Sequence, residues 1–242
     1  MSLESNRVLI LIPAYNEALR LGKVLSSIRA LHPQMDLLVV DDGSKDGTSK
    51  TAETHGARCV THPFNMGYGV ALQTGYKYAL NHNYDFLVQM DGDGQHDPSF
   101  ISTLLDPVRS EQADVVIGSR FLAPSSNNTD AEKYKASFAR RIGMRVFGSI
   151  ASLCIRQWIT DPTSGYQAMS NKVFYIHAGD KFPVDYPDAD VIIMLHRAGF
   201  RIREVPVRMF PSPDNKSMHS GLKPLYYIFK MLLSIFVTLL RK

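Results

Sequence analysis

Short apolar runs alternate along the chain with longer segments in which apolar residues recur every three or four positions. The first run, Arg7–Ile12, has Pro13 directly behind it and is typical of a strand buried on both faces of a sheet. The next segment, Glu17–Leu31, has its leucine, isoleucine and valine residues at helical spacing. We expect further strands at Asp36–Val40, Ala57–Thr61, Tyr84–Met90 and Asp114–Gly118, and helices at Thr48–His55, Gly67–Leu80 and Phe100–Arg109. This alternation predicts βαβ units around a mostly parallel sheet, and so an α/β fold.

The second half of the chain is less regular. Ala131–Trp158 has a helical pattern, whereas Asp161–Ser170 (DPTSGYQAMS) is typical of a polar turn. Val191–Ala198 predicts a short helix and Arg201–Val207 a strand, and Phe210–Gly221 has the Pro, Ser and Gly of a mobile loop.

Polar clusters directly follow four of the predicted strands. They read PAYNE at 13–17, DDGS at 41–44, DGDGQ at 91–95 and GSR at 118–120. In parallel α/β sheets, ligands bind beyond the carboxyl ends of the strands. We therefore expect one edge of the sheet to carry the function.

The strand Tyr84–Met90 runs into two aspartates, Asp91 and Asp93. An EF-hand loop would require other residue types at the places of Gln95, His96 and Ser102. Carboxylates at a strand end suit a hard cation such as Mg²⁺ or Mn²⁺, which prefers oxygen ligands and leaves room for phosphate oxygens. The alternative is a turn held by Asx hydrogen bonds.

Other side chains at this edge have two interpretations each. Arg120 is either a bidentate donor to a diphosphate or part of a surface ion pair. Tyr15 offers a face for a base or packs on the protein, and Asp42 could accept a hydrogen bond from a base, whereas Asp41 could cap a helix near Ser44. The phosphate-binding patterns GxxxxGK[ST] and GxGxxG are absent, so the glycines of Asn65–Gly69 (NMGYG) are interpreted as a tight backbone passage.

Six motifs in order resemble those of glycosyltransferase family 2, in particular the dolichyl- or polyprenyl-phosphate mannose and glucose synthases. They are PAYNE (13–17), VVDDGSKDGT (39–48), NMGYG (65–69), DGDGQHDP (91–98), GSR (118–120) and DPTSGYQAM (161–169). The resemblance extends from about residue 7 to 220. It implies a Rossmann-like GT-A fold, a nucleotide-diphosphate-sugar donor and a divalent metal, Mg²⁺ or Mn²⁺.

The resemblance also implies roles for individual residues. Those that would hold the nucleoside are Pro13, Tyr15, Glu17 and Asp42. Asp91 would lie at the ribose or donor sugar, and Asp93 and Gln95, together with Asp91, would bind the metal. Arg120 would stabilise the leaving nucleotide, and those that would reach an acceptor phosphate are Arg140, Thr163 and Ser164.

The reaction implied is an inverting sugar transfer to a polyprenyl phosphate or another lipid-linked or glycan acceptor. A lipid phosphate, which we favour, needs no strong base, whereas a sugar hydroxyl would require Asp190 or Asp188 to take its proton. The subgroup has a Glu-x-Glu-like segment where this chain has Asp188-Ala-Asp190. The alternative functions are a sugar nucleotidyltransferase and a catalytically silent nucleotide-sugar-binding protein.

Charge is distributed unevenly along the chain. Residues 1–196 carry 18 Lys and Arg against 21 Asp and Glu, whereas residues 197–242 carry 9 against 2. A basic C-terminal quarter favours an anionic partner there, either phosphates or a membrane surface. Cys59 and Cys154 lack metal-like spacing and indicate a reduced, cytoplasmic protein.

We expect two units, a catalytic domain over residues 1–220 and a C-terminal amphipathic helix over 221–242. Leu225–Leu240 contains Lys230 and is shorter than the ~20 apolar residues that span a bilayer. The helix would therefore lie in the membrane interface on the cytoplasmic face, or pack on the domain or on a second subunit. Lys216 and Ser217, in the loop before it, would reach phosphate. No nucleic-acid partner is expected.

Overall fold

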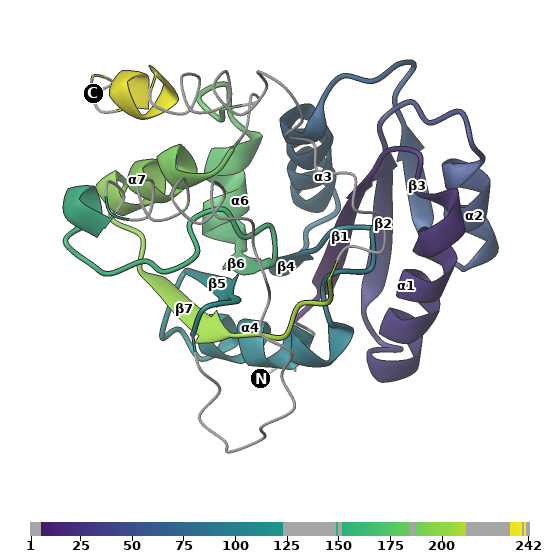
Figure 1. Ribbon diagram of the computed structural model, residues 1–242, viewed down its shortest axis with the longest axis horizontal. Helices are drawn as coiled ribbons and strands as arrows, with labels where there is room; N and C mark the ends of the chain where they lie inside the picture. Colours follow the sequence, from purple (N-terminus) through teal and green to yellow (C-terminus); the bar gives the residue numbers. More distant parts are fainter. Residues whose placement is uncertain are drawn as a thin grey trace.

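The computed structural model describes residues 6–122, 149, 152–183, 187–211, 233–238 and 240. Within these ranges, seven strands form one sheet in the order β3-β2-β1-β4-β6-β5-β7 (Figure 1). The strands are β1 (Val8–Ala14), β2 (Asp36–Asp41), β3 (Arg58–Thr61), β4 (Phe86–Gln89), β5 (Val115–Ser119), β6 (Gln167–Ser170) and β7 (Ile202–Pro206). Neighbouring strands are parallel except where β6 pairs with β4 and β5.

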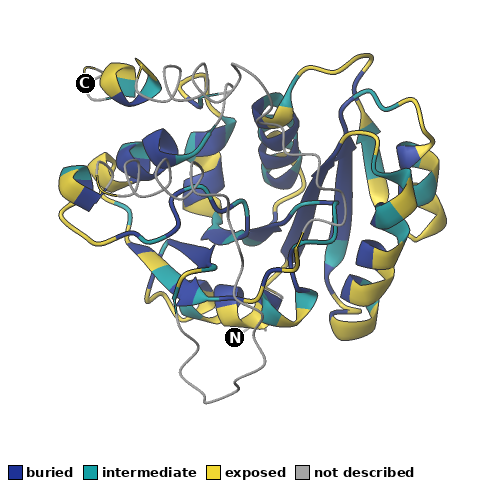
Figure 2. Cartoon of the chain, viewed as in Figure 1, coloured by how far each residue is buried: buried dark blue, intermediate teal, exposed yellow. Residues whose placement is uncertain are grey.

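Helices cover both faces of the sheet (Figures 1 and 2). They are α1 (Ala18–Leu31), α2 (Thr48–Thr54), α3 (Tyr68–Asn81), α4 (Ile101–Arg109), α6 (Asn171–Ala178) and α7 (Ala189–Arg197), with a 3-10 turn at Pro98–Phe100. Along β1, Leu9 and Leu11 pack into one core, and Ile10 and Ile12 pack into the other. The first core contains residues of α3, α6 and α7, and the second contains residues of α1, α2 and α4. Burial on both faces explains why β1 is apolar at consecutive positions.

The mostly parallel α/β fold and its regular elements are confirmed. The predicted strands and helices up to residue 120 begin and end within two residues of their predicted bounds. The same holds for the predicted helix Val191–Ala198 and the predicted strand Arg201–Val207. One prediction is wrong: Gln167–Ser170, expected as part of a polar turn, forms β6. This short strand lies between β4 and β5 and bonds to both, so its stability comes from two neighbours that are distant in sequence.

Two further expectations are only partly covered by the described residues. In the predicted helix Ala131–Trp158, residues 152–155 are helical, but Arg156–Trp158 are not, because Arg156 adopts a positive φ of 54°. The loop Phe210–Gly221 lies outside the described residues beyond Pro211, and so does most of the C-terminal segment, of which residues 233–238 are helical. No helix in the described ranges combines the length and hydropathy needed to cross a bilayer.

Candidate active site

The four polar clusters lie at one edge of the sheet, as predicted. β1, β2, β4 and β5 share one direction, because β4 and β5 are both antiparallel to β6. Their carboxyl ends therefore carry Tyr15–Glu17, Asp42, Asp91–His96 and Arg120 to the same edge.

The loops after β1 and β2 are joined by hydrogen bonds. The backbone N–H of Asn16 donates to Ser44 Oγ at 2.8 Å, and its side-chain oxygen accepts from the N–H of Lys45 at 3.0 Å. The N–H of Glu17 donates to Thr48 Oγ1 at 2.9 Å. Asn16 has φ 56°, a conformation that asparagine tolerates better than most residues. These bonds fix the loop that carries Tyr15 and Glu17, two of the residues proposed to hold the nucleoside. Tyr15 is exposed, whereas Pro13, a third such residue, is buried in β1.

Asp42 is buried and holds the turn that precedes α3. Its carboxylate accepts from the N–H groups of Met66 and Gly67 and faces His62 Nδ1, each at 2.8 Å. A carboxylate has about four lone-pair sites, so this arrangement leaves room for one more donor. The expectation that Asp41 caps a helix is wrong, because it instead accepts from the N–H of Ser44 at 3.0 Å, well before α2 begins.

The NMGYG segment does pass close to the DDGS loop. A Cβ on Gly43, which has φ 73°, would lie 2.8 Å from the backbone N of Asn65. The segment also makes a contact with a predicted site residue that was not expected from the sequence: the Tyr68 hydroxyl donates to Asp91 Oδ1 at 3.1 Å. The sequence did contain a signal for this contact, because Tyr68 is an aromatic residue at the start of a helix that begins at this edge of the sheet.

His96 orients Asp91 from the other side. The N–H of Asp91 donates to His96 Nδ1 at 3.0 Å, so the proton of the neutral imidazole lies on Nε2, 3.7 Å from Asp91 Oδ2. Burial lowers the pKa of His96, whose ring stacks on Tyr166 at 4.8 Å, and the histidine is neutral. Desolvation raises the pKa of Asp91, while the Tyr68 hydrogen bond and the charge of Arg120 oppose this.

Asp93 lies where the DGDG loop crosses the end of β1. Gly92 sits against Ile12 there, since a Cβ would be 3.4 Å from its side chain. Asp93 is near enough to Glu17 for its charge to help desolvation raise the pKa of Glu17. Its carboxylate accepts from the N–H of Gln95 at 2.9 Å and from the Gln95 side-chain amide. The Asx turn considered as an alternative is thus present, and it draws Gln95 to Asp93.

The residues present fit a divalent cation that arrives with a substrate. The described part of the chain holds no group of three or more His, Cys, Asp or Glu residues placed to enclose a metal. Mg²⁺, however, usually keeps several waters and binds through one or two carboxylates together with substrate phosphates. Asp93 and Gln95, whose side chains are in contact, supply a carboxylate and an amide oxygen of that kind, and Asp91 lies two residues before Asp93 in the same loop.

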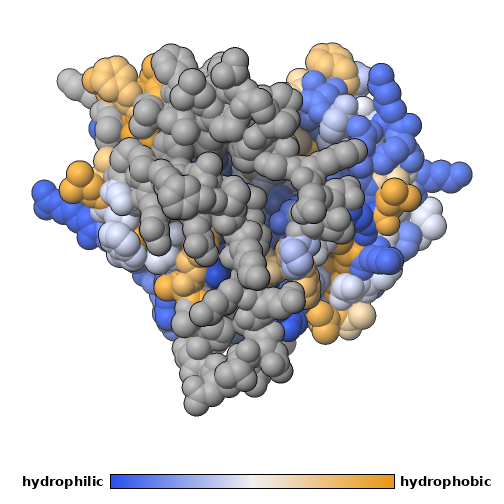
Figure 3. All heavy atoms as spheres, viewed as in Figure 1, coloured by the Kyte–Doolittle hydropathy of each residue, from blue (hydrophilic) through white to orange (hydrophobic). Residues whose placement is uncertain are grey.

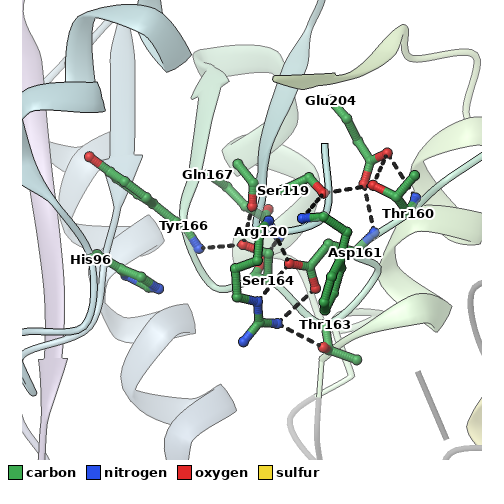
Figure 4. Close-up of polar contacts among 12 residues, drawn as sticks. His96, Ser119, Arg120, Thr160, Asp161, Thr163, Ser164, Tyr166, Gln167 and Glu204 are labelled. Atoms are coloured by element: carbon green, nitrogen blue, oxygen red, sulfur yellow. Dashed lines mark hydrogen bonds and ion pairs between the residues drawn. The ribbon is translucent and has the colours of Figure 1, made fainter. Parts of the chain in front are cut away.

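Arg120 forms a buried ion pair rather than a surface one. Its Nε and Nη2 donate to the two oxygens of Asp161, each at 2.7 Å, and Nη2 also donates to Thr163 Oγ1 at 3.3 Å (Figure 4). Asp161 is held in turn by β7, because its N–H donates to Glu204 Oε1 at 2.8 Å. The N–H of Thr160 donates to Glu204 Oε2 at 2.8 Å. Asp161 and Glu204 are not among the site residues predicted from the sequence, although Asp161 opens the motif DPTSGYQAM.

The proposed acceptor residues differ in their surroundings. Thr163 lies against Arg120, whereas the buried Ser164 hydroxyl donates to the carbonyl of Gly118 at 2.6 Å and secures the loop to β5. Arg140, Lys216 and Ser217 lie outside the described residues.

Asp188 and Asp190 face different parts of the protein. Asp190 is buried, and its Oδ1 accepts from the N–H groups of Asp188 and Val191 at 3.0 and 2.9 Å. Its Oδ2 accepts from the Ser234 hydroxyl of the C-terminal helix, and burial raises the pKa of Asp190. Desolvation raises the pKa of the Tyr68 phenol, and the charge of Asp188, which lies near Tyr68, adds a smaller contribution.

Comparison with known proteins identifies the family. The model for glycosyl transferase family 2 matches residues 9–176, and the chain belongs to this family of sugar-transferring enzymes. The chain is 34% identical to undecaprenyl-phosphate mannosyltransferase of Micrococcus luteus, over 89% of this chain and 88% of the relative. It is 28% identical to polyprenol monophosphomannose synthase of Mycolicibacterium smegmatis, over 94% of this chain and 86% of the relative.

Solved structures agree on the fold. Glucosyl-3-phosphoglycerate synthase from Mycobacterium tuberculosis superposes with a TM-score of 0.70 at 19% identity, over 97% of this chain and 80% of that one. Another structure of that enzyme, with Mn²⁺, uridine-diphosphate-glucose and phosphoglyceric acid, has a TM-score of 0.67 at 21% identity, over 97% of this chain and 80% of that one. The GT-A-like architecture expected from the motifs is confirmed.

Proposed function

We propose that this family 2 enzyme is an inverting, metal-dependent transferase that moves a sugar from a nucleotide-diphosphate sugar to a polyprenyl phosphate. Two relatives that cover most of the chain are named for transfer to, or synthesis on, such lipid phosphates. The fold neighbour bound to Mn²⁺ and a uridine-diphosphate sugar supports the donor class and the metal. Membership of the family favours sugar transfer over nucleotidyl transfer or silent binding.

One observation carries the proposal. Two carboxylates after β4, Asp91 and Asp93, share a sheet edge with the guanidinium of Arg120, which Asp161 holds in a fixed orientation. Mg²⁺ or Mn²⁺ bound by Asp93 and Gln95, beside Asp91, would supply positive charge to the donor diphosphate. The guanidinium of Arg120 stabilises the negative charge that develops on the departing nucleoside diphosphate, and it needs little reorganisation because Asp161 has already oriented it.

The remaining residues bind the two substrates. The nucleoside lies against Pro13, Tyr15, Glu17 and Asp42. Asp91 accepts a hydrogen bond from a hydroxyl of the ribose or the sugar. The acceptor phosphate is bound near Thr163, with Arg140, Lys216 and Ser217 as further cationic or hydroxyl groups, and Ser164 holds the loop that carries Thr163.

A phosphate acceptor is already anionic and needs no strong base. If the acceptor were a sugar hydroxyl, Asp188 would be better placed than Asp190 to take its proton, because the Asp190 carboxylate is buried and bonded to Ser234. Asp190 would then help to position Asp188, because its carboxylate accepts a hydrogen bond from the backbone N–H of Asp188.

The enzyme would act as a peripheral protein on the cytoplasmic face of the membrane. The described part of the C-terminal helix exposes Leu233, Phe236 and Leu240. Figure 3 shows hydrophobic side chains where this helix lies in Figure 1, at the upper left. These side chains could enter the membrane interface and hold the sheet edge near a lipid-linked acceptor.

Transfer to lipid tests the proposal directly. The protein is incubated with Mn²⁺, a guanosine- or uridine-diphosphate sugar and a polyprenyl phosphate, and the glycosylated lipid is measured beside released nucleoside diphosphate. We expect a lipid product that EDTA and Asp93→Ala abolish. Transfer to a free glycan but not to the lipid would show that the acceptor is a glycan and not a polyprenyl phosphate. No turnover with any donor would refute the transferase assignment.

A further inference from the structure

A chain of hydrogen bonds runs from Tyr76, a buried residue of α3, to Asp91. The Tyr76 hydroxyl donates to Gln89 Oε1 at 2.6 Å, and Gln89 Nε2 donates to the Tyr68 hydroxyl oxygen at 3.2 Å. Tyr68 then donates to Asp91 Oδ1 at 3.1 Å. Every group in the chain has a consistent role as donor or acceptor, so each bond supports the direction of the next.

The Tyr76 end of this hydrogen-bond chain is buried, whereas the Tyr68 end is partly exposed. Tyr76 and Gln89 are buried, and the Tyr76 ring packs against His177 and Phe182 with centroids 5.0 and 5.5 Å away. Tyr68 is 44% exposed, so its position depends strongly on the contacts of its hydroxyl. The terminal torsion of an aspartate is broad, and a carboxylate therefore needs hydrogen-bond donors to hold its plane.

Gly165 closes the same contact from the opposite side. A Cβ at this position would lie 2.9 Å from the Tyr68 hydroxyl oxygen and 3.4 Å from both carboxylate oxygens of Asp91. Its φ is not in the left-handed region, so backbone conformation does not require glycine here. Glycine instead leaves room for the close approach of Tyr68, because a Cβ here would force the hydroxyl to shift relative to Asp91.

We infer that Tyr68 is a positioning residue that orients the Asp91 carboxylate toward the donor, and that Gly165 preserves the space this arrangement needs. The inference rests on the proposed function, in which Asp91 binds a hydroxyl of the nucleotide sugar. It adds the Tyr76–Gln89–Tyr68 chain and the loop glycine to the donor site, and none of these residues is itself placed in contact with the donor.

The test compares Tyr68→Phe, Gly165→Ala and the double variant with the parent. Binding of GDP-mannose and of UDP-glucose, each with Mn²⁺, is measured by calorimetry, and donor KM and kcat are measured for the donor that binds. Losing one hydrogen bond to a carboxylate should weaken donor affinity about tenfold in Tyr68→Phe. Gly165→Ala should weaken it at least as much. In the double variant the hydroxyl that would clash is absent, so Gly165→Ala should add little to Tyr68→Phe.

Tyr84→Phe is the matched control, because the Tyr84 hydroxyl donates to Asp36 Oδ2 at 2.8 Å at the opposite end of β2. It should leave donor affinity unchanged. Thermal melting verifies that each variant folds, and the exposure of Tyr68 makes Tyr68→Phe decisive if Gly165→Ala does not fold.

The outcomes separate this inference from the function on which it rests. A parent protein that binds neither donor would overturn the proposed function and the inference with it. A parent that binds, with Tyr68→Phe binding equally well, would overturn the positioning role alone. If the two substitutions weakened donor affinity independently and additively, Gly165 would have no part in positioning Tyr68.

Discussion

Arg120 and Asp161 concentrate opposite charges in a buried part of the site. Both side chains are almost fully inaccessible, and they meet through two parallel hydrogen bonds. Removing one partner of such a pair leaves a buried charge without compensation, which is more costly than losing the pair as a whole. The ion pair that orients the guanidinium therefore also makes the stability of the protein sensitive to mutation of either residue.

Arg120→Ala should lower the free energy of unfolding by about 3–5 kcal/mol, because Asp161 would remain buried and unpaired. Denaturation in urea measures this. Arg201→Ala is the control, since Arg201 pairs with Asp114 while 57% of its side chain is exposed, and it should change stability little. Equal effects of the two substitutions would contradict the buried-pair argument.

For kinetics, Arg120→Lys is the better variant because it keeps the positive charge. Lysine cannot reproduce the bidentate contact, so the charge would be less well oriented. We expect kcat to fall more than donor KM rises, since the charge on the diphosphate grows as the bond breaks. Unchanged kcat at saturating donor would exclude a role for Arg120 in leaving-group stabilisation.

We expect His177 to make the stability of the protein sensitive to acid. Neither ring nitrogen has a hydrogen-bond partner among the described residues, and burial lowers the pKa of His177 to about 3 from its usual 6.5. Below pH 6.5 the unfolded chain binds a proton at this residue that the folded chain does not. The stability associated with neutral His177 is therefore present above pH 6.5 and is lost as the pH falls toward 3.

His177→Phe should thus stabilise the protein, because phenylalanine fits beside Tyr76 and Phe182 and has no nitrogen to leave unpaired. The gain should be about 1–3 kcal/mol at pH 7 and should grow by up to ~1.4 kcal/mol per pH unit below 6.5. Urea denaturation at pH 7 and pH 5 measures both, with the exposed His82→Phe as control. A parallel loss of stability in parent and His177→Phe would show that His177 does not cause the acid sensitivity.

At the scale of elements, the C-terminal helix is attached to α7. Ile235 is buried in the core that contains Ile192 and Leu195, and Arg197 Nη1 donates to the carbonyl of Thr238 at 2.8 Å. The Ser234 hydroxyl donates to Asp190 near the start of α7. Packing on the domain, one of the three placements considered for this segment, therefore accounts for the side of the helix that faces α7.

Ser234→Ala should lower the free energy of unfolding by about 1–3 kcal/mol, because one oxygen of the buried Asp190 would lose its donor. Thermal or urea denaturation measures the change. The control is Ser110→Ala, which removes an exposed hydroxyl that donates to the carbonyl of Asp106. Stability equal to that of the parent would indicate that the Ser234–Asp190 contact contributes nothing.

At the scale of the whole molecule, the question is whether the outer side of this helix contacts a membrane. Phe236 is 58% exposed although its neighbour Ile235 is buried, so the helix is apolar on its outer side as well. The amphipathic character expected from the sequence stays a prediction, because the structure describes only residues 233–238 and 240 of this segment. Exposed apolar side chains beside a basic C-terminal quarter fit an anionic lipid surface.

Phe236→Ser with Leu240→Ser should reduce sedimentation with anionic liposomes severalfold, since both residues are exposed and neither belongs to the core. This variant is preferable to truncation at Gly221, which would also remove Ile235 and Ser234. Leu31→Ser, which replaces an exposed leucine at the end of α1, is the control. Equal liposome binding by parent and variant would leave the helix with a packing role alone.

The sequence by itself determined the order of the elements and the edge of the sheet that carries the site. Periodicity is local, so Leu9–Ile12 or the first helix could be recognised from adjacent residues. The common edge follows from the parallel direction of the strands, which places all carboxyl ends together. Motif resemblance then supplied the family, which the comparisons confirmed.

Only the tertiary structure decided which partner each functional side chain has. Arg120 pairs with Asp161, Tyr68 with Asp91 and Asp190 with Ser234, and each pair joins different elements. The strand β6 likewise exists because β4 and β5 lie on either side of it. A local pattern carries no information about which distant backbone will be adjacent, and the energy of these contacts arises only when packing removes both partners from water.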